Sequence, residues 1–177
     1  MAAFGRILQD EHMTITQEIF AVFTQCRTKS YLSSHSAAVS EDAAGRARQH
    51  WEQIYQRNGL SRLRADALDG QLYVGTATVD AIQQQRYRVI LDCMISAYDL
   101  NAQVHGLELV QSRRTKGRRT YVPIRLASTE RISTADKLRL AFDAFVFSQA
   151  CGIAPPRLGK LIHGREYRTT IVPLPPL

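Results

Sequence analysis

The stretch from Tyr87 to Leu126 constrains the fold more than any other part of this 177-residue chain. It holds two segments rich in Val, Ile, Leu and Tyr, Arg88–Gln111 and Thr120–Leu126, in which apolar and polar residues alternate. Such alternation is typical of β-strands, so we expect one long strand, bulged where the pattern breaks, paired with a second strand. The polar sequence SRRTKGRR between the segments predicts the connecting turn.

Helical patterns on either side of this stretch are expected to cover the sheet. Thr16 can cap a first helix that ends near Tyr31, and Ser40 can start a second helix. We expect the second helix to stop at Asn58-Gly59, because glycine commonly ends helices. The pattern then predicts a short strand at Leu72–Val74 and a short helix at Thr78–Gln85.

The C-terminal third of the chain contains clearer signals for the start and end of a helix. Ser133 with Asp136 three residues later forms a capping-box pattern, which predicts a helix that ends at Gly152. The following prolines forbid continuation of that helix. Two short strands joined by a turn at His163-Gly164 are expected next.

Length and element order together indicate one domain. The chain is long enough for a substantial core, so we expect a single domain over residues 1–177. Residues 1–14 are expected to be irregular, and residues 173–177, which read PLPPL, to form a proline-rich tail or linker. The order helix, helix, strand, helix, long strands, helix, short strands predicts an α/β or α+β fold.

The charge of the chain favours a polyanionic partner. The formal net charge is +7, and nucleic acid is the first candidate for such a partner. The turn between the two long strands can be a solvated hairpin tip, or a finger that contacts backbone phosphates without reading sequence. Its basic residues are Arg113, Arg114, Lys116, Arg118 and Arg119.

Cysteine usage and hydropathy suggest a reducing, non-membrane location. Cys26, Cys93 and Cys151 are scattered and odd in number, which fits the cytoplasm and argues against a disulfide framework. Three cysteines are also too few for a four-cysteine iron–sulfur cluster, so we expect none. No run approaches 18 apolar residues and the N-terminus lacks a cleavable apolar core, so we expect neither a membrane span nor a secretion signal.

Two groups of residues could carry chemistry. His50 lies at the edge of the apolar stripe of the second helix, where it is either a histidine at the core margin or a metal ligand. On the expected long strand, Asp99 and His105 share one face, and a bulge near Gly106 would bring Glu108 to join them. A single carboxylate beside a histidine is a poor magnesium site, so for Glu108 alone we favour a solvated or salt-bridged strand residue.

Several local patterns, taken in order, resemble a known nuclease family. The segments ITQEIFAVFTQCRTKSYL, GRARQHWEQI, DKLRLAFDAFVFSQACG and PPRLGKLIHG are similar to successive motifs of the nuclease domain of RecB-type helicase–nucleases. The related CRISPR adaptation nucleases share this pattern, and both belong to the PD-(D/E)xK superfamily. The resemblance spans most of Ile15 to Leu174. It implies a restriction-endonuclease-like α/β fold with a central mixed sheet flanked by helices, DNA as the substrate, and Mg²⁺ or Mn²⁺ if the protein is active.

The catalytic strands depart from the pattern of that family. The family holds its metal with an aspartate on one strand and D/E-x-K on the next. In this chain His105 occupies the aspartate position, Pro123 the acidic position and Arg125 the lysine position, while Asp99 is an alternative aspartate in another register. Arginine keeps a positive charge near a phosphate but is a poor base. On the following helix the resemblance places Arg139 where the family has glutamine, and Phe142 where it has tyrosine.

Three hypotheses follow from these observations. The first is a RecB-like fold with a degenerate cleavage site that serves as a DNA-binding or assembly module, for example in a larger helicase, CRISPR or defence-type assembly. The second is an active nuclease with an atypical site, in which His105, Glu108 and Arg125 are catalytic and a metal is held by His50, Asp99, His105 and Glu108. In the first two hypotheses Arg139 and the basic turn bind nucleic acid. The third is a protein-interaction domain without nucleic acid function.

Overall fold

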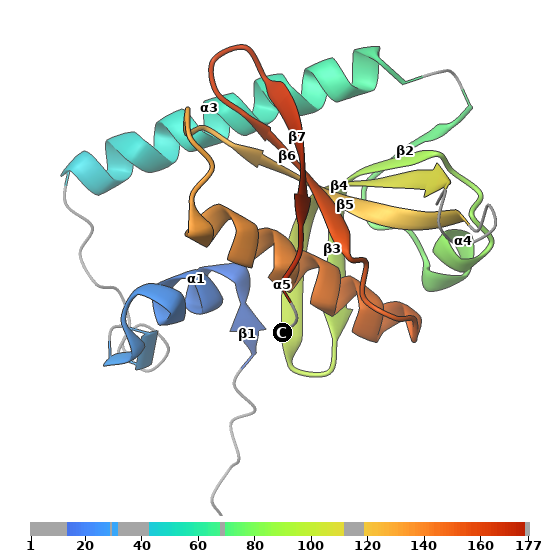
Figure 1. The fold of residues 1–177 in the computed structure, drawn as a ribbon, viewed down its shortest axis with the longest axis horizontal. Coiled ribbons are helices and arrows are strands. Elements are labelled where there is room, and N and C mark those ends of the chain that lie inside the picture. Colours follow the sequence, from blue (N-terminus) through green and yellow to red (C-terminus); the bar gives the residue numbers. More distant parts are fainter. Residues whose placement is uncertain (1–13, 29, 32–42, 68–69, 112–118, 176–177) are drawn as a thin grey trace, which may run out of the picture.

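A seven-stranded mixed β-sheet forms the centre of the protein (Figure 1). The structure is a computed structural model that describes residues 14–28, 30–31, 43–67, 70–111 and 119–175. The strands run in the order β2-β3-β4-β5-β6-β7, and β1 pairs with β4 off this path. The strands are β1 (Ile15–Thr16), β2 (Leu72–Val74), β3 (Val89–Ala97), β4 (Leu100–Gln111), β5 (Arg119–Ala127), β6 (Leu158–His163) and β7 (Arg168–Pro173).

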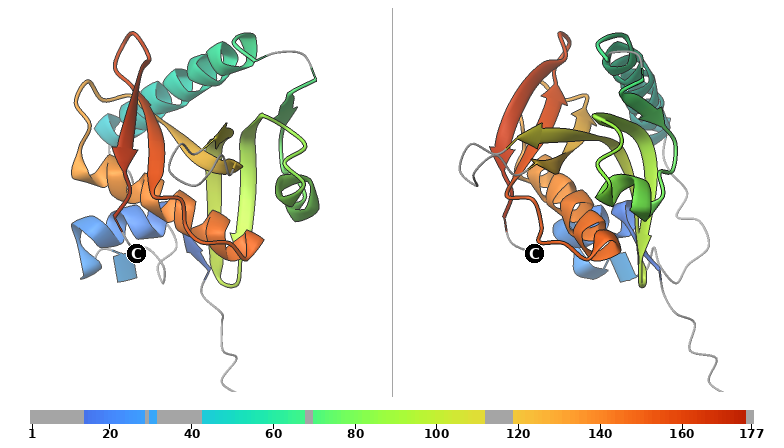
Figure 2. Two further views of the ribbon diagram at one scale, coloured as in Figure 1. Left: turned by 45° about the vertical axis from the view of Figure 1, so that its right-hand side comes forward. Right: turned by 90° about the vertical axis from the view of Figure 1, so that its right-hand side faces the viewer.

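Helices cover both faces of this sheet, so the expectation of an α/β fold with a central mixed sheet is confirmed. On one face α5 packs against β3, β4 and β5, and the Phe20 ring of α1 stacks on Phe142 of α5 at 4.7 Å. On the other face α3 packs against Ile124, Leu126 and Ile162 (Figure 2). The helices are α1 (Gln17–Gln25), α3 (Ala43–Ala65), α4 (Val79–Gln83) and α5 (Thr134–Cys151).

Local capping signals predicted the starts of two helices. The Thr16 side chain accepts a hydrogen bond from the Ile19 amide at the start of α1, and Ser133 and Asp136 form the expected capping box of α5. Helix α5 ends at Gly152, which adopts a left-handed conformation with φ of 63°, as predicted. Helix α1 ends earlier than predicted, because Cys26 has extended backbone angles that stop the helix after Gln25.

The long strand predicted over Arg88–Gln111 is instead a hairpin of β3 and β4. The antiparallel register runs from Val89 opposite Glu108 to Ala97 opposite Leu100. The chain reverses at Tyr98 and Asp99, where Tyr98 has φ of 52°. Apolar and polar residues alternate on both sides of the turn because each strand has one side on the same core, so the sequence pattern did not reveal the reversal at Tyr98 and Asp99.

Helix α3 continues six residues past Gly59, where the sequence predicted its end. Gly59 is the buried residue of this helix. A Cβ atom at this position would lie 2.5 Å from Cδ2 of Leu126 and 3.1 Å from Cε1 of Tyr167. The glycine therefore permits close packing of α3 on the sheet and does not end the helix.

We expect Gly59→Ala to lower the free energy of unfolding by about 1 kcal/mol. Overpacking a core costs about 1–3 kcal/mol, and the better helix propensity of alanine returns about 1 kcal/mol of that cost. Urea unfolding followed by circular dichroism measures the change. Asn58→Ala, at the exposed neighbouring position, is the matched control and should be neutral or stabilising. If both variants were stabilised equally, close packing at Gly59 would be disproved.

The sheet divides between β4 and β5, and this division positions the candidate site. The two strands pair only from Gly106 opposite Ile124 outward to Gln111 opposite Arg119. Beyond Ile124, β5 continues with β6 as its partner, whereas the first half of β4 pairs with β3 and β1. Backbone groups of β5 that face the divided region need other partners, and side chains supply them.

Candidate functional site

A buried carboxylate lies at the centre of the candidate site. Asp143 of α5 has no solvent exposure, and its Oδ2 lies 3.0 Å from Nη1 of Arg125 on β5. The amide nitrogen of Gln17 at the start of α1 donates to the other carboxylate oxygen and also to the carbonyl of Gln103, at 3.2 Å. Burial raises the pKa of Asp143, and the guanidinium of Arg125 opposes that shift. Both oxygens are therefore hydrogen-bonded inside the protein, as a buried charge requires.

The imidazole of His105 fills the division between β4 and β5. Its Nδ1 accepts a hydrogen bond of 2.9 Å from the backbone amide of Leu126. Burial, and then the positive charge of Arg125, lower the pKa of His105 to about 3. The ring is therefore neutral and carries its proton on Nε2, so neither nitrogen offers a free lone pair to a metal ion.

A second guanidinium approaches the same carboxylate. Arg139 lies one helical turn before Asp143 on α5, and its charge acts on Asp143 together with that of Arg125. The Nε atom of Arg139 is buried without a hydrogen-bond partner among the described residues. The structure thus brings Arg125 and Arg139 to the same carboxylate. We call the group Gln17, His105, Arg125, Arg139 and Asp143 the ionic cluster.

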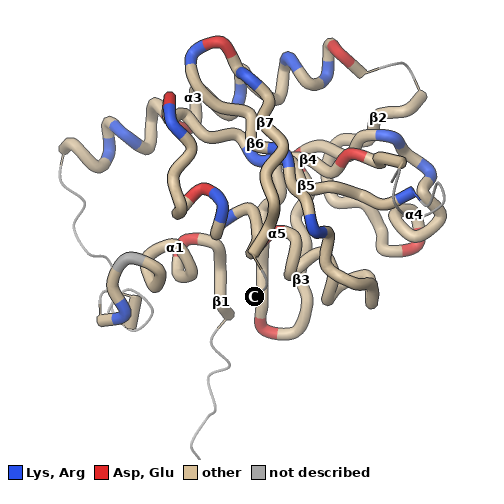
Figure 3. Tube along the Cα trace, viewed as in Figure 1, with Lys and Arg blue, Asp and Glu red and all other residues tan. Residues whose placement is uncertain are grey.

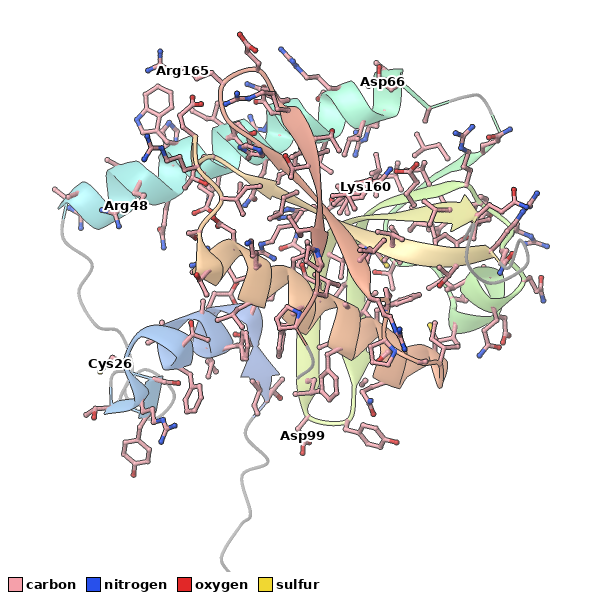
Figure 4. The ribbon with its side chains drawn as sticks, viewed as in Figure 1. Cys26, Arg48, Asp66, Asp99, Lys160 and Arg165 are labelled. Atoms are coloured by element: carbon pink, nitrogen blue, oxygen red, sulfur yellow. The ribbon has the colours of Figure 1, made fainter. Side chains whose placement is uncertain are left out.

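Glu108 lies on the opposite face of the sheet from this cluster. It forms an ion pair with Lys160 of β6. Lys160 is the strand partner of Ile124, whose side chain packs on the α3 side of the sheet, so Glu108 lies on that side too. Glu108 lines a cleft of about 160 Å³ with Arg88 and Asp66, the latter labelled beyond the end of α3 in Figure 4. The prediction that a bulge would bring Glu108 beside His105 is therefore wrong. The interpretation of Glu108 as a salt-bridged strand residue agrees with its contact.

The four predicted metal ligands lie in four different places. His50 is exposed on α3, and Asp99 is exposed at the tip of the β3–β4 hairpin, where Figure 4 shows it at the edge of the molecule. His105 is buried in the ionic cluster, and Glu108 is paired with Lys160. Among the described residues, no three His, Cys, Asp or Glu side chains converge as a metal site needs. The residues proposed from the sequence thus do not fit a Mg²⁺ or Mn²⁺ centre in this arrangement.

The basic turn predicted to contact nucleic acid lies outside the described residues, apart from its last member. Arg119 is exposed at the start of β5, and its carbonyl accepts a hydrogen bond from the side chain of Gln85. Arg113, Arg114, Lys116 and Arg118 belong to residues 112–118, which the structure does not describe.

A second basic surface on α3 was missed in the sequence. Figure 3 marks Lys and Arg positions in blue at several points along this helix. It carries five arginines against one glutamate, Glu52. The end of the helix predicted at Gly59 concealed this pattern, because the last two arginines lie beyond it. The arginines are Arg46, Arg48, Arg57, Arg62 and Arg64.

The sequence matches no protein-family model, and no curated protein matches it. Among the described residues, no helix combines the length and apolarity needed to cross a membrane. The resemblance to RecB-type nucleases therefore depends on the sequence motifs quoted above.

Proposed function

We propose that the protein is a DNA-binding or assembly module with a RecB-like, restriction-endonuclease-like fold whose cleavage centre is degenerate. The observation that carries this proposal is the ion pair between Arg125 and buried Asp143. The resemblance assigns a catalytic lysine to the position of Arg125. Here that side chain neutralises a carboxylate of the protein itself, so it is not available to a substrate.

The chemistry of the ionic cluster supports loss of cleavage. Metal-assisted phosphodiester hydrolysis needs at least two oxygen ligands that converge on the metal, and a group that can take a proton from water. Pro123 has no ligating side chain, and Arg125 stays protonated at every physiological pH. The lone pair of His105 Nδ1 is already held by the Leu126 amide. None of these three residues can perform the role that the resemblance gives to its position.

The charge distribution supports nucleic acid as the partner. The chain has a formal net charge of +7, and α3 carries five exposed arginines against one glutamate. Arginines of this kind bind backbone phosphates without reading sequence, and they release counterions when they do so. A protein-interaction domain without nucleic acid function would not need this arrangement.

The proposal predicts DNA binding without DNA cleavage. Labelled single- and double-stranded DNA should stay intact with Mg²⁺ and with Mn²⁺, and binding should weaken steeply with salt. For three phosphate contacts on duplex DNA, affinity should fall about 40-fold between 50 and 200 mM salt. Filter binding and gel analysis measure both quantities.

Two variant pairs sharpen this experiment. Arg57→Ala with Arg64→Ala on α3 should reduce the slope of log affinity against log salt by about 2, since each phosphate contact contributes about 1. Arg86→Ala with Arg157→Ala, both exposed and outside α3, is the matched control. Cleavage abolished by Glu108→Ala or His105→Ala would overturn the proposal in favour of an active, atypical nuclease. The absence of any salt-sensitive binding would favour the protein-interaction domain.

A further inference from the structure

An aromatic stack stands beside α3 on the side of the β6–β7 turn. The rings of Tyr55 and Tyr167 are parallel within 8°, with centroids 4.4 Å apart. The guanidinium of Arg62 lies 4.4 Å above the centroid of Tyr167, in cation–π geometry. Two hydrogen bonds fix the stack, because Tyr55 Oη donates to the Gly164 carbonyl at 3.0 Å and Tyr167 Oη donates to the Tyr55 carbonyl at 3.2 Å.

Trp51 lies near this stack along α3 and is exposed to solvent. It lies one helical turn before Tyr55 and is 68% exposed, whereas most tryptophan side chains are largely buried. Residues spaced by three, four or seven positions share one side of a helix, so Arg48, Trp51, Tyr55 and Arg62 form one stripe along α3. With Tyr167 they make up what we call the aromatic–arginine face.

The surroundings of this face are positively charged. The Arg165 side chain is 97% exposed in the β6–β7 turn, and Figure 4 shows Arg48 and Arg165 on the same side of the molecule. Glu130 is paired with Arg165 and Arg168, at 4.0 and 3.3 Å. Across α3, the β6–β7 turn, Arg168 at the start of β7 and Glu130, there are seven arginines and three glutamates. The arginines are Arg46, Arg48, Arg57, Arg62, Arg64, Arg165 and Arg168, and the glutamates are Glu52, Glu130 and Glu166.

We propose that the aromatic–arginine face binds single-stranded DNA, with an unpaired base stacked on Trp51 and the neighbouring arginines on backbone phosphates. This inference rests on the proposed function and adds the strand form and the location of binding. Bases within a duplex already stack on one another, so only an unpaired base can offer its flat surface to an exposed indole. Alternating aromatic rings and cations on a basic surface is how proteins bind single strands without sequence preference.

The chain offers a direct optical test, because Trp51 is its single tryptophan. A base stacked on the indole should quench the intrinsic fluorescence of the full-length protein. We expect a thymidine 20-mer to quench it, and a duplex of equal length to bind with little quenching. Equal quenching by the duplex, or none by either DNA, would overturn the stacking arrangement.

Substitutions test the same point through affinity. Trp51→Ala should weaken binding of the 20-mer about 5- to 150-fold, the usual range for loss of one stacking platform. Trp51→Phe, which keeps a ring, should restore most of the affinity, and duplex affinity should stay unchanged in both variants. Tyr98→Ala, at an 89% exposed aromatic residue on the distant β3–β4 hairpin, is the matched control.

The outcomes separate this inference from the proposed function. If wild type binds DNA with a steep salt dependence while Trp51→Ala binds the single strand equally well, the aromatic–arginine face is overturned and DNA binding stands. If wild type binds neither single strand nor duplex at low salt, both are overturned. Vesicles of anionic lipid serve as a competing polyanion, and loss of vesicle binding alone in Trp51→Ala would assign the face to membranes.

Discussion

Asp143→Asn should lower the free energy of unfolding by about 3–5 kcal/mol, the largest single effect that we expect. Removal of one partner of a buried ion pair leaves the other charge uncompensated in a medium of low polarity. Here the charge left without a partner is that of Arg125, which is itself nearly buried and cannot lose its proton. Urea unfolding at neutral pH, followed by circular dichroism, measures the change.

A double variant separates charge from packing at this position. Arg125→Met with Asp143→Leu removes both charges and keeps apolar volume, so it should be clearly more stable than Asp143→Asn alone. Gln17 then loses one acceptor but keeps the carbonyl of Gln103. A loss below about 1 kcal/mol for Asp143→Asn would contradict the expectation, and would mean that the carboxyl is neutral in the folded protein.

The second large effect is a loss of stability in mild acid that depends on His105. The pKa of His105 is about 3 in the folded protein, whereas an exposed histidine has a value near 6.5. Between these two values the unfolded chain binds a proton that the folded chain does not, so the free energy of unfolding falls as pH falls. The contribution should be fully present above pH 6.5 and about 2 kcal/mol smaller at pH 5.

His105→Asn isolates this contribution from the other titrating groups. The asparagine carbonyl can accept the Leu126 amide hydrogen bond, but it does not titrate. Unfolding in urea at pH 7 and pH 5 should show that the variant loses about 2 kcal/mol less than wild type over this interval. Parallel losses in the two proteins would mean that His105 is already exposed to protons in the folded state.

Those parts of the fold that depend on neighbouring residues could be predicted from the sequence. The capping box at Ser133 and the left-handed glycine at position 152 act within one helical turn, so their signals are complete in a short window. The same local logic was wrong for Gly59, because the glycine is required by close packing on Leu126, which lies far away in the sequence. It was also wrong for Tyr98, where a turn interrupts an alternation that both strands share.

The candidate site was predictable only in part, for a related reason. The family resemblance singled out Arg125 and Arg139, and both approach Asp143 in the structure. No local sequence pattern identified Gln17 or Asp143 as site residues, because their role depends on a contact between segments that lie far apart in the sequence. Trp51 lies on the same helix as His50, and the local sequence did not mark it as exposed. Its exposure depends on which side of α3 meets the sheet, and periodicity alone does not specify that side.

The ionic cluster has a consequence for the order in which the chain can fold. Gln17 donates to a carboxylate 126 positions later, so a ribosome-bound chain cannot complete this contact until α5 has emerged. Helix α1 is synthesised well before its partners Phe142 and Asp143 of α5. Contacts between such distant segments form slowly and late. During synthesis, therefore, α1 stays without its contacts to α5 until residue 143 has emerged, although β1 can already pair with β4.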